Sequence, residues 1–189
     1  MPSPVGHLLA GGVVALLSHR WQRPRRPART GIILGCAALA ALPDADLIYQ
    51  PLHRTVTHSL VSIPLIAIIA TLVTGWVTGR RSIWVGVLCG LAWGSHIPLD
   101  WLGADPNPPQ GIQALWPFSS RSFISGVDLF ASTERRHLFS QTTLLKNLRA
   151  VVQEILLVGP VLLWLWLSRG GADRRRRAST QSPLNSQQP

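Results

Sequence analysis

Two stretches of this chain combine acidic and histidine side chains in patterns that could bind a divalent metal ion. Carboxylates and imidazoles are common ligands of such ions. Two carboxylates placed close together repel each other unless a cation or base neutralises them, so a metal is a natural partner. Acids beside Pro43 could instead form an N-cap and a first-turn acid of a helix. The first stretch, LPDADLIYQPLHRTVTHS at 42–59, holds Asp44, Asp46, His53 and His58.

His96 and Asp100 form the second pattern, H-x-x-x-D. In a helix these two positions lie one turn apart on the same face, so both side chains could reach one ion. An ionisable group in a membrane helix costs about 2.5 kcal/mol or more near the bilayer centre, so such groups usually have a function. A hydrogen-bonding pair near the membrane interface is the alternative interpretation.

The histidines of the first stretch need a particular backbone to bind metal. His53 and His58 are five residues apart and do not share a helical face. A loop-to-helix junction between them would let both rings turn inward, whereas a solvent-facing loop histidine is the alternative for each. His7 interrupts the first apolar segment near its outer end, which makes it a further candidate.

Glu154 is the remaining candidate ligand, because it is the only acid in the last apolar segment of the chain. It could bind a metal or orient a ligand histidine. An ion pair with Lys146 or Arg149 is the alternative.

The composition indicates an integral membrane protein. The sequence is 47% hydrophobic and only 14% charged, with eight tryptophans, a profile typical of membrane proteins. The net charge of +10 could indicate a nucleic-acid partner. Its arginines, however, stand in blocks between apolar segments, which the positive-inside rule explains more simply. We therefore expect membrane lipid around the protein and no nucleic acid. Cys36 and Cys89 lie in apolar segments without a C-x-x-C motif and are expected to be buried hydrophobic residues.

Five apolar segments predict an all-α, polytopic helical membrane protein. The first segment has only 14 residues, fewer than the roughly 20 that a full span needs, so we expect it to be tilted or buried. Residues 1–168 are expected to form one membrane-embedded domain, and 169–189, which are basic and then polar, a disordered tail. The five segments are 5–18, 31–49, 60–79, 82–102 and 150–168.

The arginine blocks predict the orientation of these segments. The connectors after the first and third segments hold five and two arginines, and the tail holds five. Placing these blocks inside puts the N-terminus outside and the C-terminus in the cytoplasm. The outer side then receives seven of the eight acids. The candidate ligands are thereby expected to form one polar cluster at the outer ends of the helices.

Five motifs, in this order, resemble the YdjM-type family over about residues 5–168: HLLAG at His7, LPDADLI at Leu42, HRTVTHS at His53, SHIPLDWL at Ser95 and LWPFS at Leu115. The resemblance implies a metal-dependent hydrolase of the inner membrane.

A more distant likeness to zinc-dependent phospholipase C and P1-type nucleases implies a zinc centre. Their H-x-x-x-D pair is matched by His96 and Asp100, and their early histidine by His7. Their intervening aspartate and histidine are matched by Asp44 or Asp46 and by His58. The chain lacks their H-x-x-x-E motif, so one or two ions are expected rather than three.

Together these observations favour hydrolysis of a phosphoester or lipid-derived substrate at the outer face of the membrane. The bound ion would polarise the substrate and activate water, with Asp44 as general base and Arg54 contacting a phosphate oxygen. Two alternatives remain: a non-enzymatic membrane protein with a structural metal, and a transport component whose acids line an ion pathway. The candidate metal ligands are His7, Asp46, His53, His58, His96, Asp100 and Glu154.

Overall fold

The computed structural model describes residues 1–18, 26–48, 53–106, 108–135 and 137–181. Within these ranges the chain is all-helical and forms no β-sheet, as the sequence predicts. The described residues form seven helices in this order: α1 (Pro4–Ser18), α2 (Arg26–Ala41), the 3-10 helix η1 (Leu42–Ile48), α3 (Ser62–Thr78), α4 (Ile83–Gly94), α5 (His96–Leu102) and α6 (Gln141–Gln181).

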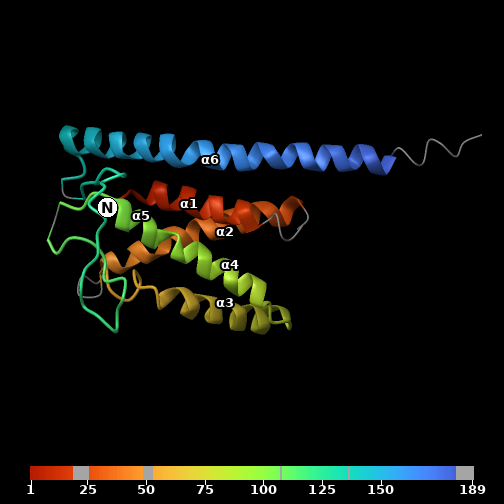
Figure 1. Ribbon diagram of the computed structural model, residues 1–189, viewed down its shortest axis with the longest axis horizontal. Coiled ribbons are helices and arrows are strands. Elements are labelled where there is room, and N and C mark those ends of the chain that lie inside the picture. The colour runs from red at the N-terminus through yellow and green to blue at the C-terminus, as the bar shows by residue number, and fades with distance from the viewer. Residues whose placement is uncertain (19–25, 49–52, 107, 136, 182–189) are drawn as a thin grey trace, which may run out of the picture.

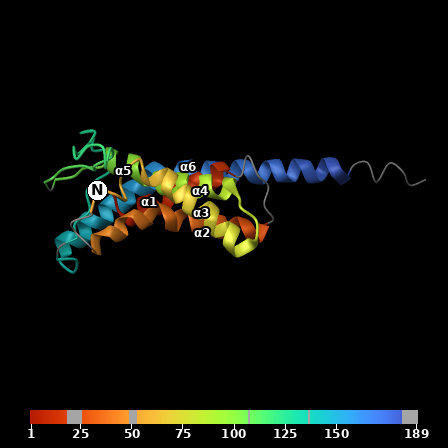
Figure 2. The same cartoon turned by 90° about the horizontal axis from the view of Figure 1, so that it is seen from below.

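The helices run back and forth along one long axis (Figure 1). Successive long helices are antiparallel, and α6 lies along the bundle and extends past it at the end opposite the N-terminus (Figures 1 and 2). The starts of α1, α3 and α6 and the ends of α2 and α5 therefore lie at the same end of the molecule, together with the connector 103–140. We call this the connector end.

Glycines allow the helix pairs to pack closely. A Cβ atom at Gly11 of α1 would lie 2.3 Å from the carbonyl oxygen of Cys36 in α2, and one at Gly86 of α4 would lie 2.4 Å from that of Ala67 in α3. Small residues at helix contacts are typical of membrane bundles, because they bring the backbones together. These glycines therefore let α1 lie directly against α2, and α4 directly against α3.

Within the part of the chain that the structure describes, two helices are long and apolar enough to cross a membrane, Thr30–Ile48 and Gln141–Ser168. Two further apolar helices, Pro4–Ser18 and Ser62–Thr78, are shorter. Large apolar side chains cover the outside of the bundle; Trp76 of α3 is 87% exposed and Trp164 of α6 is 63% exposed. An outer surface of this kind suits a lipid environment.

Two of the predicted segments differ in the structure. The segment 82–102 is divided at Ser95 into α4 and α5, because Pro98 has no N–H to continue the hydrogen-bond ladder and fits instead in the first turn of a new helix. The last segment is longer than expected: α6 begins at Gln141 and its backbone remains helical through Gln181, where disorder was expected from residue 169. Residues 182–189 lie outside the described ranges.

Candidate metal centre

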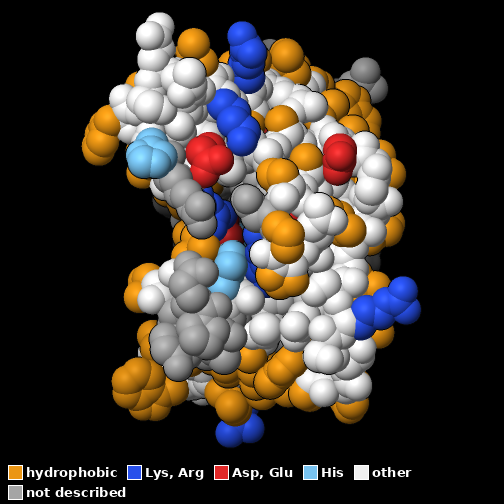
Figure 3. All heavy atoms as spheres, turned by 90° about the vertical axis from the view of Figure 1, so that its left-hand side faces the viewer, with side chains coloured by type: hydrophobic (Ala, Val, Ile, Leu, Met, Phe, Trp, Pro, Cys, Tyr) orange, Lys and Arg blue, Asp and Glu red, His pale blue; other side chains and the backbone are white. Residues whose placement is uncertain are grey.

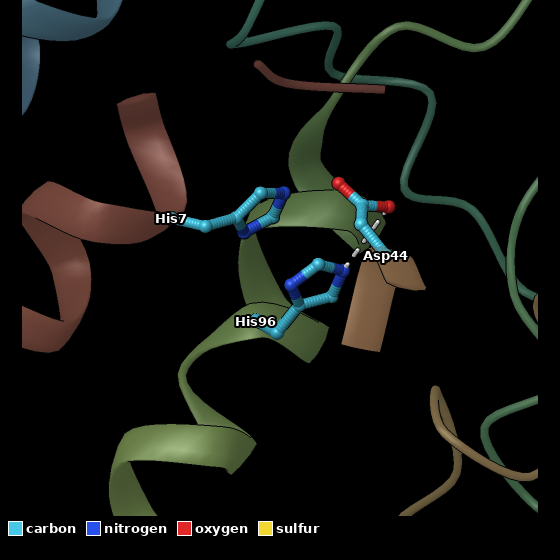
Figure 4. A group of neighbouring side chains, drawn as sticks. All are labelled: His7, Asp44 and His96. Carbon is cyan, nitrogen blue, oxygen red and sulfur yellow. Dashed lines mark ion pairs between the residues drawn. The ribbon is translucent and has the colours of Figure 1, made fainter. Parts of the chain in front are cut away.

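A buried cluster of histidine and aspartate side chains lies at the connector end. The side chains of His7, His58, His96 and Asp100 are at most 1% exposed, and that of Asp44 is 10% exposed. Figure 4 shows His7 on α1, His96 on α5 and Asp44 on η1 converging from three elements. We call these five residues the His/Asp cluster.

Three atoms of the cluster have the spacing of ligands around one ion. His58 Nε2 lies 3.1 Å from His96 Nε2. Asp100 Oδ2 lies 3.3 Å from His58 Nε2 and 3.1 Å from His96 Nε2. A tetrahedral zinc ion with bonds of about 2.0–2.1 Å keeps its ligand atoms roughly 3.3 Å apart. These atoms therefore match three corners of a zinc site.

Hydrogen bonds on the far side of both rings fix which nitrogen faces the centre. His96 Nδ1 lies 2.8 Å from the carbonyl oxygen of Ala40, which can only accept, so Nδ1 carries the proton. His58 Nδ1 lies 2.9 Å from the hydroxyl oxygen of Thr57, which donates its own proton to Asp46 and therefore accepts from Nδ1. A carboxylate oxygen of Asp46 lies 3.2 Å from the same nitrogen. The two Nε2 lone pairs then face each other, an arrangement that a cation between them would stabilise.

The pKa of His58 also indicates that a cation is favoured beside its Nε2 atom. Burial alone would lower the pKa of His58, but the neighbouring carboxylates of Asp100 and Asp46 outweigh it and raise the pKa to about 9. In the absence of a metal ion the ring would therefore hold a second proton at neutral pH. The surroundings favour a positive charge at His58 Nε2, whether a proton or a metal supplies it.

Several buried atoms of the cluster have no hydrogen-bond partner among the described residues. They are both ring nitrogens of His7, both oxygens of Asp100 and Oδ2 of Asp44. A buried polar group without a partner costs about 1–3 kcal/mol, so five in one place indicate a binding site for a polar ligand. The chemistry of these atoms suits a divalent cation.

His7 extends the cluster beyond the first three donors. Its ring stacks on that of His96, with centroids 3.6 Å apart, and its Nε2 lies 3.5 Å from Asp100 Oδ1. His7, Asp44 and His96 form a second group whose ligand atoms lie within 4.8 Å of one another, beside the group of His58, His96 and Asp100. The cluster could thus hold one or two ions.

Asp46 and His53, both predicted as ligands, lie beside the cluster. Asp46 Oδ1 is 2.7 Å from His53 Nδ1, and Asp46 Oδ2 accepts hydrogen bonds from the hydroxyl of Thr57 and the backbone N–H of Arg54. With these bonds and its contact to His58 Nδ1, Asp46 orients a cluster histidine. Thr57 contributes to this support and was not identified from the sequence, although it directly precedes His58.

Glu154 is fully buried but lies outside both groups of potential ligands. Its Oε1 accepts a hydrogen bond of 2.5 Å from the backbone N–H of Ser3, and its Oε2 accepts one from the Ser3 hydroxyl. Glu154 thereby fastens the start of α1, one turn before His7, to α6. It positions a cluster histidine through the backbone.

Arg54 contacts a different carboxylate from those of the cluster. Its guanidinium group lies 2.6 Å and 3.2 Å from the two oxygens of Asp105 and donates to the carbonyl oxygen of Pro109 at 2.8 Å. The Arg54 carbonyl oxygen accepts from Gln113 N–H at 2.9 Å. These bonds fasten the turn that carries His53 and His58 to the connector.

Arg135 brings a positive charge to the cluster that was not predicted from the sequence. Its Nη2 lies 3.4 Å from Asp44 Oδ1, although the two residues are 91 positions apart. Its only sequence signal is the run of charge E-R-R at 134–136. Figure 3 shows the connector end, where acidic, basic and histidine side chains line a hollow.

The all-helical fold, the apolar outer surface and the buried polar cluster define a class of helical membrane protein with a candidate metal centre at one end. The chain belongs to the YdjM inner membrane protein family, whose sequence model matches residues 1–174. The resemblance drawn from the five motifs is therefore confirmed, and with it a membrane location. Comparisons with curated proteins and with solved structures each found no match.

Proposed function

We propose that this protein is an integral membrane, metal-dependent hydrolase that acts on a phosphoester or lipid-derived substrate at the outer face. One observation carries the proposal: His58 Nε2, His96 Nε2 and Asp100 Oδ2 form a buried triangle with edges of 3.1–3.3 Å. Ala40 and Asp46 hold both rings so that these nitrogens face inward. Three protein ligands are the number typical of catalytic zinc sites.

Each residue of the cluster has a role in this proposal. His58, His96 and Asp100 would hold the ion, with zinc expected from the ligand types and their tetrahedral spacing. His7 would supply a ligand to a second ion. A divalent ion at this position supplies Lewis acidity that polarises the substrate and activates water. Asp44 would act as general base, because its Oδ2 has no hydrogen-bond partner among the described residues and can accept a proton.

The arrangement of the charges supports the proposed topology. Arg80 and Arg81 lie in the turn between α3 and α4, at the opposite end of the bundle from the cluster (Figure 1). Under the positive-inside rule this end is cytoplasmic, so the cluster lies on the outer side. We propose five membrane segments, with the N-terminus outside and the C-terminus in the cytoplasm.

The non-enzymatic alternative has its own support. The cluster joins α1, η1, α5 and the turn before α3, so a closed site could serve only to hold these elements together. An ion pathway is less well supported, because the acids gather at the ends of the helices.

Metal analysis combined with an activity assay tests the proposal. We expect the protein purified in detergent to contain one or two zinc ions per chain and to hydrolyse 4-nitrophenyl phosphate or bis(4-nitrophenyl) phosphate. Both properties should be lost in His96→Gln and retained in His137→Gln, a matched change at an exposed connector histidine. Bound metal without turnover of either ester would support the structural role, and absence of metal would overturn the metal centre.

A further inference from the structure

We infer that Arg135 binds an anionic oxygen of the substrate and that the substrates are accordingly phosphate esters. This inference rests on the proposed function, since it assigns a substrate class to the same site. Its first support is the position of the guanidinium group, 3.4 Å from Asp44 Oδ1. That oxygen also lies 3.9 Å from His96 Nε2 and 4.0 Å from His58 Nε2. One carboxylate thus separates Arg135 from the centre of the cluster.

Exposure increases from the cluster toward Arg135. The side chains of His58 and His96 are fully buried, that of Asp44 is 10% exposed and that of Arg135 is 37% exposed. A ligand that reaches the cluster past Asp44 therefore meets the guanidinium group on its solvent side. The hollow at the connector end contains basic side chains together with acidic and histidine side chains (Figure 3).

The backbone beside Arg135 is held firmly on α6. Asn147 accepts a hydrogen bond of 2.7 Å from the N–H of Glu134 and donates one of 2.8 Å to the carbonyl oxygen of Glu134. Gln153, further along α6, accepts from the N–H of Ala131 at 2.9 Å. A binding group that is held in place in advance loses less entropy when the ligand arrives. The backbone next to Arg135 is therefore already fixed by hydrogen bonds to α6, as expected for a residue that binds a ligand.

Among the described residues, one contact leaves most donors of the Arg135 guanidinium group available. Among the described residues its side chain has one polar contact, the single 3.4 Å approach to Asp44, whereas Arg54 uses its guanidinium group for Asp105 and Pro109. A guanidinium group offers five N–H donors in a planar fork that matches phosphate oxygens. It can therefore donate hydrogen bonds to an anion while it contacts Asp44.

This arrangement favours a ligand with several charged oxygens. A phosphate ester could direct one oxygen into the cluster and another to Arg135. A carboxylic ester or an amide has a single carbonyl oxygen and would leave the guanidinium group without a contact to the substrate. Arg135 should thus distinguish phosphate esters, either free in solution or as a lipid headgroup, from neutral substrates.

Binding of inorganic phosphate to the zinc-loaded full-length protein in detergent tests the inference by calorimetry. We expect Arg135→Ala to weaken phosphate binding roughly 10- to 100-fold, with Arg135→Lys intermediate and the zinc content unchanged in both. The control is Arg121→Ala, which removes an exposed arginine of the same connector whose guanidinium group lies 5.9 Å from the ring centroid of Phe123. It should bind phosphate as the wild type does.

The outcomes separate the two proposals. If Arg135→Ala holds zinc and binds phosphate as tightly as the wild type, or if the zinc-loaded wild type binds no phosphate, the role of Arg135 is overturned and the metal centre stands. A wild-type protein without zinc overturns the metal centre itself, and the inference with it. Once Arg135-dependent binding is observed, competition identifies the source of the phosphate. Stronger competition by dihexanoyl phosphatidic acid than by glycerol phosphate indicates a lipid headgroup, and equal competition a soluble ester.

Discussion

The substitution Asp100→Asn tests the metal centre most directly, because Asp100 lies beside all three histidines of the cluster. Its Oδ2 is 3.1 Å from His96 Nε2 and 3.3 Å from His58 Nε2, and its Oδ1 is 3.5 Å from His7 Nε2. Asparagine keeps the size of the side chain but removes the negative charge and replaces one oxygen with an NH₂ donor. The variant therefore loses a ligand without creating a large cavity.

The expected loss of zinc affinity in Asp100→Asn can be estimated by comparison with Asp46. Removal of a carboxylate that only orients a ligand histidine typically reduces metal affinity 10- to 100-fold, and we expect this range for Asp46→Asn because Asp46 contacts His58 through Nδ1. Asp100 is assigned as a ligand itself, so Asp100→Asn should reduce zinc affinity by more than about 100-fold, or roughly 2.8 kcal/mol. The double variant with His96→Gln should be little worse than either single variant, since both changes affect one ion.

Competition with a chelator of known zinc affinity measures these effects on protein in detergent. The matched control is Asp128→Asn, which neutralises an exposed acid of the connector and should leave the affinity unchanged. Thermal unfolding of the metal-free proteins separates loss of a ligand from loss of the fold. Wild-type affinity in Asp100→Asn would refute its assignment as a ligand, and a larger loss in Asp46→Asn would reverse the two roles.

Three further predictions concern topology, the tail and the connector. A reporter fused after Arg177 should behave as cytoplasmic and one inserted at Pro108 as external; the reverse pair of results would contradict the orientation. Deletion of 170–189 should leave the zinc-to-protein ratio unchanged, because the cluster lies at the other end of the bundle; loss of zinc would reveal a role for the tail. Asp105→Asn should destabilise the protein by about 3 kcal/mol, because it removes the charge partner of Arg54 in a largely buried pair. A thermal unfolding midpoint equal to that of wild type would contradict this last prediction.

The sequence by itself determined the class of the protein and which end of the bundle carries the site. Apolar segments separated by arginine blocks predicted an all-helical membrane protein, because a helix satisfies its own backbone hydrogen bonds within a bilayer. Since successive helices alternate in direction, polar residues at alternate helix ends must meet at one end. The H-x-x-x-D spacing also predicted that His96 and Asp100 would lie together, which the 3.1 Å contact within one turn of α5 confirms.

Only the tertiary structure decided which acid faces the cluster and which cation accompanies it. Residues two apart in a 3-10 helix point about 120° apart around the axis, so η1 directs Asp44 toward the cluster and leaves Asp46 to orient His58. The partners of Glu154 and Asp44, which are Ser3 and Arg135, lie 151 and 91 positions away in the chain. The local sequence pattern does not predict such pairings. They depend on how the helices pack against one another and on how the connector folds over the helix ends.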